Sequence, residues 1–268
     1  MKNRYIIPVM AGLLLVFFSC SRQETAVTET ADELSQDVLA HIAALGFSTE
    51  GAYAHDGGYI VENDIFLPAE DLNQIAEVKA LIVGNQEQYR TTNLVTGLPR
   101  VITISMASQL PASYSPAVDE MISRYNSANL QLTFSRVASN GDIRLVKGNG
   151  NFLASAGFPT ATGAPFNQVK INANAIGTGT STTFINYVAT IMAHEVGHCI
   201  GFRHTDYMDR SYSCGGATAN EGASTVGAVH IPGTPTVADS GSWMLACIGS
   251  NQNRPFNNND VTALTFLY

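Results

Sequence analysis

The chain has few charged residues and still fewer basic ones. Of its 268 residues, 13% are charged, and 14 Lys and Arg stand against 22 Asp and Glu, which gives a formal net charge of −8. Nucleic-acid binding needs clustered Lys and Arg against the phosphates, so this composition excludes nucleic acid as a partner. The 45% of hydrophobic residues is ordinary for a folded globular protein and excludes a chain that is disordered throughout.

Long hydrophobic runs are absent after the first twenty residues, which excludes a membrane protein with several spans. The one run, Ile6–Phe18, is shorter than the roughly 20 residues that a helix needs to cross a bilayer. It follows the basic residues Lys2 and Arg4 and ends beside the small Ser19. A basic start, an apolar stretch of this length and a small residue at its end are typical of a secretory signal, and predict one over residues 1–19.

Cys20 directly follows the predicted signal peptide. The pair Ser19-Cys20 resembles the lipobox of bacterial lipoproteins, although Phe17 stands where leucine is usual. The resemblance implies that Cys20 is lipidated and starts the mature protein, with the polar residues 20–32 as a tether. The protein would then be exported and anchored in a bacterial membrane. We expect the outer membrane, on its periplasmic or surface face, or release from it. A plain signal peptide and a single membrane anchor are the alternatives.

Cysteine is scarce, with four residues in the chain, of which three follow Cys20. Export favours disulfide formation, but an odd number leaves one thiol over. Cys199 falls within a predicted helix, and we expect it to be buried and reduced. Cys214 and Cys247 lie in loop-like sequence, and we expect them to form a disulfide, although spacing alone does not determine this pairing.

Residues 33–96 are expected to form a small N-terminal domain or propeptide. Apolar residues recur at helical spacing in 33–46, and Gly46 ends this predicted helix. A strand is expected at 59–66 and a second helix at 69–82. The segment 87–97 is a predicted linker to the rest of the chain.

Residues 97–268 have the pattern of a second, larger domain. A long helix is expected to begin at a Ser181 or Thr182 cap. Asn259 is expected to cap the last helix, and a cap explains Asn258 and Asp260 better than the calcium site at which they hint. The order of elements indicates an α+β domain with a mixed sheet, and loops prevail over residues 203–259. Strands are expected at 101–104, 130–137, 142–146 and 169–172, and helices at 115–128, 182–200 and 260–268.

The strongest chemical signal is the run HEVGHCIGFRH at 194–204. On a helix, His194 and His198 are four positions apart and share one face, so both imidazoles can hold one zinc ion. Gly201 permits a sharp turn that a Cβ would oppose, and this turn can bring His204 back as a third ligand. Three histidines with one open position are typical of catalytic zinc. Glu195 is placed to take a proton from a water molecule that zinc activates. The alternative is a buried amphipathic helix with solvated histidines.

The extended motif resembles that of the metzincin metallopeptidases. The resemblance implies an α+β catalytic domain with a mixed twisted sheet, an active-site helix and a loop-rich C-terminal subdomain that contains a Met-turn. It places the methionine of this turn at Met244, beneath the metal histidines, where ordinary core packing is the alternative. The segments HIPGTP at 230–235 and SWMLAC at 242–247 are similar to the dual-action HEIGH metallopeptidase family. This similarity covers residues 97–268 and includes the segment VENDI at 61–65.

The resemblance implies a zinc-dependent endopeptidase that hydrolyses proteins or peptides. His194, His198 and His204 would hold the zinc, and Glu195 would act as general base and then as general acid to the leaving amine. The peptide would add to an exposed strand edge, by analogy within residues 150–167. Two alternatives differ in class: a non-catalytic surface or adhesion module that retains the fold, and zinc-dependent hydrolysis of a bond other than a peptide bond.

The sequence leaves open the roles of several residues that follow the histidine motif. Ala246 stands where some related enzymes carry a tyrosine that binds zinc, so that role is vacant here. Tyr207 or His230 would be available to stabilise an oxyanion, but a packed aromatic ring and a loop histidine are the favoured interpretations. Asp206 either anchors the turn after His204 or caps it in solvent.

A separate question is whether the enzyme is made in an inactive form. Many related enzymes are kept inactive by a propeptide whose Cys or Asp fills the open zinc position. No cysteine lies between residues 21 and 198, which excludes a cysteine in this role. Asp56, Asp64 and Asp71 are candidates, and the sequence does not choose among them.

Overall fold

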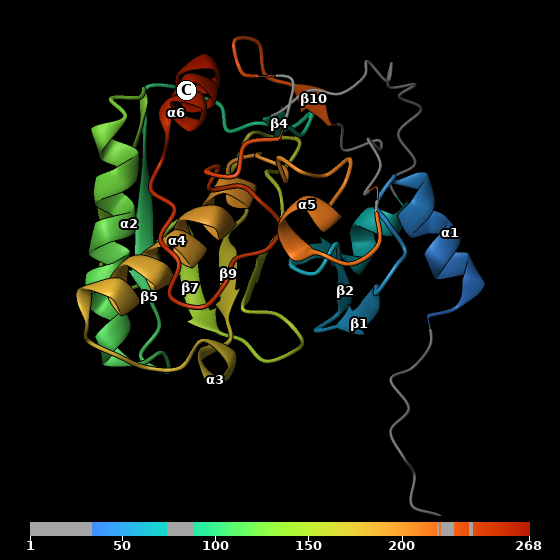
Figure 1. Cartoon of the computed structure of the whole chain (residues 1–268), viewed down its shortest axis with the longest axis horizontal. Coiled ribbons are helices and arrows are strands. Elements are labelled where there is room, and N and C mark those ends of the chain that lie inside the picture. The colour runs from blue at the N-terminus through green and yellow to red at the C-terminus, as the bar shows by residue number, and fades with distance from the viewer. Residues whose placement is uncertain (1–33, 74–87, 219, 221–227, 236–237) are drawn as a thin grey trace, which may run out of the picture. The chain divides into compact units, whose positions relative to one another are not determined.

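The computed structural model describes residues 34–73, 88–218, 220, 228–235 and 238–268 (Figure 1). The predicted signal peptide, Cys20, the tether and most of the helix expected at 69–82 lie outside these residues. Among the helices of the described ranges, none has the length and apolarity that a membrane span requires.

One mixed sheet of eight strands organises the described chain, in the order β1-β2-β3-β8-β9-β7-β5-β6. The pairs β3–β8, β7–β9, β5–β7 and β5–β6 are parallel, and β1–β2, β2–β3 and β8–β9 are antiparallel. Strands β4 and β10 form a separate antiparallel pair. The bounds are β1 Tyr53–His55, β2 Gly58–Val61, β3 Ile65–Pro68, β4 Tyr89–Arg90, β5 Arg100–Met106, β6 Leu132–Arg136, β7 Ile143–Lys147, β8 Ala154–Ala156, β9 Gln168–Ile171 and β10 Val229–His230.

Helices α2 and α4 pack against each other and against the sheet, α2 on β6 and α4 on β8 and β9 (Figure 1). Helix α4 starts at the Ser181 cap, whose hydroxyl accepts the N–H of Phe184, and all its residues from Tyr187 to Cys199 are buried. The long predicted helix is therefore the central helix of the core. The helical elements are α1 Gln36–Ala44, η1 Ala69–Asn73, η2 Ala112–Tyr114, α2 Ser115–Ser127, α3 Ala173–Ile176, α4 Thr182–Cys199, α5 Ser211–Cys214 and α6 Asn258–Leu267.

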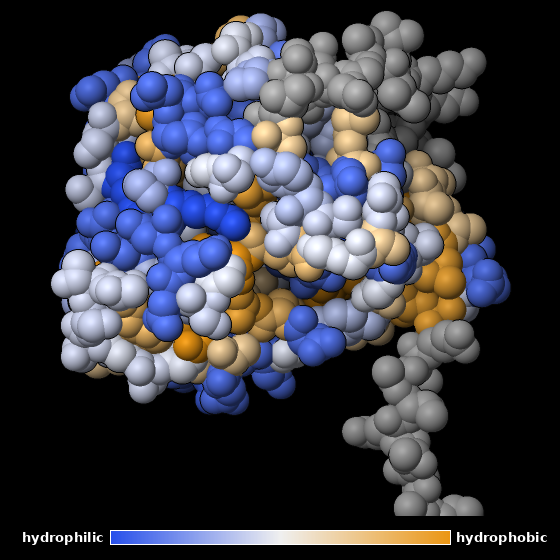
Figure 2. Space-filling model, viewed as in Figure 1, coloured by the Kyte–Doolittle hydropathy of each residue, from blue (hydrophilic) through white to orange (hydrophobic). Residues whose placement is uncertain are grey.

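The α+β class with a mixed sheet, expected from the sequence, is confirmed. The single strand expected at 59–66 is wrong. The structure has a hairpin there, because Glu62 and Asn63 adopt positive φ angles of 54° and 80° and reverse the chain between β2 and β3. The cap expected at Asn259 is also wrong, since Asn257 caps α6 and forms a capping box with Asp260. Figure 2 shows the molecule from the same side as Figure 1. Apolar residues surround a hollow that lies below the position of α4, and hydrophilic residues lie on either side of it.

The N-terminal segment shares the sheet of the larger domain. Strand β3 lies along β8, where Ile65 pairs with Ala156 and the N–H of Ala156 donates to the Asp64 carbonyl oxygen at 3.1 Å. A small apolar cluster, which includes Ile42 and Phe47, packs α1 against β2 and β3. The described residues from 34 onwards belong to one compact unit. Removal of the segment during maturation stays a prediction.

A buried ion pair connects the β2–β3 turn to the chain that follows α4. Arg203 Nη2 lies 2.8 Å from Glu62 Oε2, and both side chains are fully buried. The Ser48 backbone N–H donates to the other Glu62 carboxylate oxygen at 3.2 Å. The Arg203 guanidinium also lies over the rings of Phe47 and Tyr207, at 5.3 and 5.7 Å from their centroids. The segment and the larger domain are thus joined by a charge pair shielded from water.

Removal of one partner of this pair should be costly. We expect Glu62→Ala to lower the free energy of unfolding by about 3–5 kcal/mol, because it leaves the buried Arg203 charge without its carboxylate. The double variant Glu62→Ala/Arg203→Met should lose less than the sum of the two single changes. Urea denaturation measures both, with the exposed Glu50→Ala as control. A loss below about 1 kcal/mol, typical of a surface pair, would contradict this prediction.

Candidate metal centre

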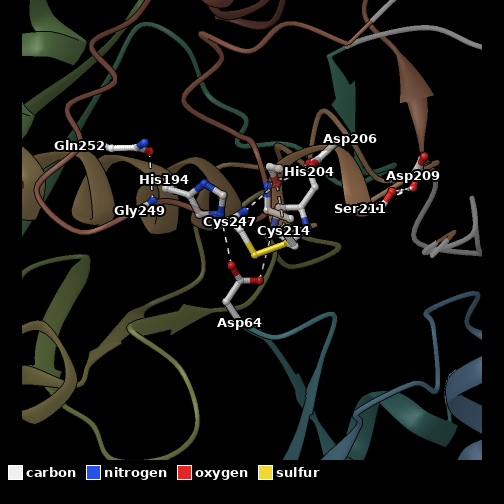
Figure 3. Close-up of a disulfide and its surroundings, with 12 residues drawn as sticks. Asp64, His194, His204, Asp206, Asp209, Ser211, Cys214, Cys247, Gly249 and Gln252 are labelled. Atoms are coloured by element: carbon white, nitrogen blue, oxygen red, sulfur yellow. Dashed lines mark hydrogen bonds and ion pairs between the residues drawn. A yellow bond between two sulfur atoms is a disulfide. The ribbon is translucent and has the colours of Figure 1, made fainter. Parts of the chain in front are cut away.

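Three histidines and one aspartate converge in the core. One ligand atom each of Asp64, His194, His198 and His204 lies within 4.8 Å of the others. Nε2 of His194 lies 3.0 Å from Nε2 of His198. The Asp64 carboxylate lies 3.4 Å from His194 Nε2, 3.2 Å from His204 Nε2 and 4.0 Å from His198 Nε2. Figure 3 shows this carboxylate pointing at His194 and His204.

Helix α4 and the turn after it bring the histidines together. His194 and His198 lie one turn apart near the end of α4, and the chain reverses at Gly201, whose φ is +108°. A Cβ on Gly201 would also lie 2.7 Å from a Leu94 methyl carbon and 3.0 Å from the Asn93 carbonyl oxygen. Glycine is therefore required at this position both by backbone conformation and by space, and the turn returns His204 to the cluster.

The donor set fits a zinc ion. His194 Nδ1 lies 2.9 Å from the Trp243 carbonyl oxygen, and His198 Nδ1 lies 2.8 Å from that of Phe202. Each Nδ1 therefore donates its N–H to a carbonyl, which leaves the Nε2 lone pair facing the cluster. In a tetrahedral zinc site the ligand nitrogens lie about 3.3 Å apart. The Nε2 atoms of His194 and His198 are 3.0 Å apart, and their lone pairs would repel each other without a cation between them. This spacing therefore suits a shared metal ion.

Burial and charge set the protonation of the cluster. Burial alone would raise the pKa of Asp64, but the neighbouring His204 and His194 outweigh it and hold that pKa well below its usual range. Burial, followed by the proximity of His194 and His204, lowers the pKa of His198. A neutral imidazole and an ionised carboxylate are the forms that bind a metal.

Glu195 lies beside the cluster and opens onto a cavity. The cavity has a volume of about 250 Å³, and His194 and Glu195 are part of its wall. Glu195 is buried, and its Oε2 has no hydrogen-bond partner among the described residues. Burial, and then the Asp64 charge, raises the pKa of Glu195 well above its usual range. This carboxyl group is therefore available to a molecule that enters the cavity.

Met244 packs directly under α4. A Cβ on Gly197 would lie only 2.6 Å from Met244 Sδ, so the glycine between the two helix histidines leaves room for this side chain. The turn around Met244 supports the site twice: the Trp243 carbonyl accepts from His194, and the Met244 carbonyl accepts the N–H of Thr205 at 2.9 Å. Met244 thus packs beneath the helix that carries two of the histidines, and its role as the methionine of a Met-turn stays a prediction.

The chain after His204 is tied to the Met244 turn by a disulfide and a polar bridge. Cys214 and Cys247 form the disulfide, and Cys199 is buried with a free thiol (Figure 3). Asp206 is buried and accepts the N–H of Ala246 at 2.9 Å and the Ser213 hydroxyl at 2.5 Å. Asp206 is therefore an anchor of this turn and not a solvent-exposed cap.

Three further candidates lie in packing or capping roles. The Tyr207 ring packs edge-on against Tyr89, with centroids 4.3 Å apart. His230 lies on β10, where its Nε2 is 3.0 Å from the Thr234 hydroxyl. Asp260 accepts the Asn257 N–H in the α6 cap, and burial raises the pKa of Asp260 to about 7. None of the three belongs to the metal cluster formed by the described residues.

Of the three aspartates considered for latency, only Asp64 reaches the histidines. Asp56 forms an ion pair with Lys170 at 2.9 Å, and Asp71 lies in η1. The sequence offered no signal to distinguish Asp64, because its position depends on the β2–β3 turn and on the pairing of β3 with β8.

Comparison with known proteins identifies the family of this chain. A family model described as dual-action HEIGH metallo-peptidase matches residues 59–268. Two solved structures of myroilysin are 20% and 18% identical, with TM-scores of 0.31, and the matches cover 43% and 48% of this chain and 54% and 59% of theirs. The chain thus spans little more than half the length of these two proteins. High choriolytic enzyme 1, a hatching enzyme zinc-protease from the medaka fish Oryzias latipes, is 15% identical with a TM-score of 0.34, over 62% of this chain and 88% of that one. No curated protein matches.

Metal analysis tests the cluster. We expect the purified chain to carry about one zinc ion, and we expect His204→Ala to lower zinc affinity by more than about 100-fold, because it removes a direct ligand. His230→Ala is the matched control, since it removes a histidine outside the cluster. Elemental analysis after dialysis against a chelator series gives both values. Zinc binding that is unchanged in His204→Ala, or lost in His230→Ala, would contradict the assignment.

Proposed function

The chain belongs to the dual-action HEIGH metallopeptidase family, and from this premise we propose that it is a zinc-dependent endopeptidase with Glu195 as its general base. The observation that carries the proposal is the position of Glu195. Its buried carboxyl group opens onto the same cavity as His194, one residue from a metal ligand. A non-catalytic module that only held zinc would not need a carboxyl group there.

The metal and the residues around it would have different roles in hydrolysis of the peptide bond. Zinc, when bound, supplies Lewis-acid chemistry, since it polarises a carbonyl group and makes water more acidic. Glu195 takes the proton of the attacking water and then passes it to the nitrogen of the leaving amine. The carbonyls of Trp243 and Phe202 hold His194 and His198 in place during this reaction.

We also propose that the N-terminal segment keeps the site latent. Two contacts support this proposal. The Asp64 carboxylate lies at 3.2 to 4.0 Å from all three histidines, where it would fill the fourth ligand position. Strand β3 covers the outer edge of β8, within the stretch expected to bind an extended peptide. Substrate would gain access when Asp64 and β3 move away together.

Activity measurements on the full chain test both parts. We expect Asp64→Ala to cleave denatured casein at least about tenfold faster than the unchanged chain, because a larger fraction of molecules has an open site. Adding Glu195→Gln to this variant should lower the rate by about 10²–10⁴-fold through loss of the general base. Release of acid-soluble peptides gives the rates.

Asp56→Ala is the control, because Asp56 lies in the same segment but pairs with Lys170. It should cleave casein as slowly as the unchanged chain. Equal rates with and without Glu195→Gln would remove Glu195 from the mechanism. Equal rates with and without Asp64→Ala would remove Asp64 from latency. Zinc content and thermal stability of each variant separate these results from misfolding.

For localisation, we propose an exported lipoprotein anchored through Cys20. The proposal rests on the basic start, the short apolar run and the Ser19-Cys20 pair. The anchor would hold the enzyme at a bacterial membrane, on a tether of polar residues up to residue 32.

Fatty-acid labelling in a bacterial host tests the anchor. We expect the unchanged protein to incorporate a labelled fatty acid and to sediment with membranes. Cys20→Ala should lose all label, since this residue is the proposed acceptor. Cys199→Ala, which removes a cysteine from the core, should keep the label. Label that persists in Cys20→Ala would exclude the lipidation site.

A further inference from the structure

Strand β1 attaches the N-terminal segment to a loop of the larger domain. β1 forms one edge of the eight-stranded sheet, next to β2 (Figure 1). The Tyr53 hydroxyl accepts the backbone N–H of Asn151 at 3.2 Å. The His55 ring packs edge-on against the Phe152 ring, with centroids 5.4 Å apart. Two side chains of β1 therefore hold the segment against residues 151 and 152, which shortly precede β8.

His55 is largely buried in this contact. Its side chain is 12% exposed, and its Nε2 has no hydrogen-bond partner among the described residues. An Asp56 carboxylate oxygen lies 3.6 Å from this Nε2. The same oxygen lies 2.9 Å from Lys170 Nζ, so it is already paired with a cation. A proton on His55 would thus lie between a phenyl ring and an ion pair whose charges cancel.

The groups around His55 favour its neutral form. Asp56 faces it from the β1–β2 turn and Lys170 from β9, while Tyr53 is an uncharged neighbour on β1, and residues 151 and 152 carry no charge. Burial lowers the pKa of His55 below its ordinary value of 6.5. The Asp56 carboxylate opposes this effect, and the Lys170 charge adds to it. The docked segment therefore suits an uncharged imidazole.

This preference links docking of the segment to pH. When the segment is released, His55 lies in water and regains its ordinary pKa, so the released form takes up a proton more readily than the docked form. Docking is therefore at full strength well above pH 6.5 and weakens as the pH falls below that value. Uptake of one proton changes such an equilibrium by at most about tenfold per pH unit.

The strand that carries His55 is continuous with the chain that carries Asp64. Strands β1, β2 and β3 form an antiparallel meander over residues 53–68, and Asp64 directly precedes β3. Loss of the contact at His55 therefore weakens the attachment of the same strands that bring Asp64 to the histidines.

Resting on the proposed latency of the endopeptidase, we propose that His55 is a pH-sensitive contact through which mild acid releases the N-terminal segment. Protonation of its ring weakens the contact of β1 with residues 151 and 152, and the fraction of molecules with Asp64 displaced increases. The enzyme stays latent at neutral pH and becomes active where the medium is acidified.

Hydrogen–deuterium exchange tests the contact without any need for catalysis. The full-length, zinc-loaded Glu195→Gln chain is compared at pH 7 and pH 5.5, with rates corrected for the intrinsic effect of pH. We expect the amides of β1 and β2 to exchange about threefold or more faster at pH 5.5. Adding His55→Gln, which stays neutral, should remove this difference. Adding His41→Gln should keep it, since the His41 ring bonds to the Asp37 carbonyl within α1.

Casein cleavage tests the connection to latency. At each pH, the rate of the unchanged chain is divided by the rate of the Asp64→Ala chain, because this ratio cancels the effect of pH on the reaction itself. We expect the ratio to rise about threefold or more from pH 7 to pH 5.5. With His55→Gln in both chains, the ratio should stay constant.

Each outcome decides one point. Equal exchange at both pH values, or a rise that persists in His55→Gln, would overturn the proposal. NMR titration of the His55 ring in the unchanged chain needs no variant, and a midpoint at or above 6.5 would also overturn it. If no chain cleaves casein at either pH, the endopeptidase proposal fails, while exchange still decides whether His55 controls docking. Zinc content and thermal stability at each pH confirm that the variants are folded.

Discussion

The metal site depends on two backbone carbonyls that hold the outer nitrogens of the helix histidines. The Trp243 carbonyl accepts from His194 and the Phe202 carbonyl accepts from His198, so both Nε2 atoms must face the same point. This arrangement imposes demands on distant parts of the chain. The turn that carries Trp243 must lie against α4, which requires a glycine at position 197, and the chain after His204 must stay against the same turn. Asp206 and the disulfide meet the second demand. The site is therefore a property of the packing around α4 and not of the motif alone.

The N-terminal segment contacts the chain that carries the third histidine. Glu62 and Asp64 lie two residues apart in one turn: the first pairs with Arg203, and the second points at the three histidines. Arg203 directly precedes His204, so one buried charge pair fixes both a metal ligand and the carboxylate opposite it. The positive φ angles at Glu62 and Asn63 are the backbone conformation that makes this possible. The proposed displacement of Asp64 from the cluster would therefore also strain or separate the buried ion pair of Glu62 and Arg203.

Local sequence was sufficient for some elements and not for others. The histidine spacing, the role of Gly201 and the extent of α4 follow from rules that act within a few residues, and the structure agrees with them. Asp64 could not be chosen, because its contact with His194 joins residues 130 positions apart, and nothing local distinguishes it from Asp56. The run Tyr59–Phe66 is apolar at both ends, and the chain reverses at the polar residues between them in a turn that contains no glycine or proline. Strand β8 was missed because Ala154–Ala156 contains no β-branched or aromatic residue and pairs only through its backbone. Three consecutive asparagines, residues 257–259, span the cap and the first two residues of α6, so the sequence left the cap position ambiguous by two residues.

The pairing of β3 with β8 affects the tendency of the protein to aggregate. Backbone donors such as the Ala156 N–H are satisfied by the N-terminal segment, and they would lose that partner under the proposed movement of the segment. An uncovered strand edge recruits any extended chain, including another copy of the same protein, and is a recognised starting point for aggregation. Under the proposed latency, the segment would also act as a cover that keeps molecules apart before activation, and an activated molecule would aggregate least while a substrate chain occupies its strand edge.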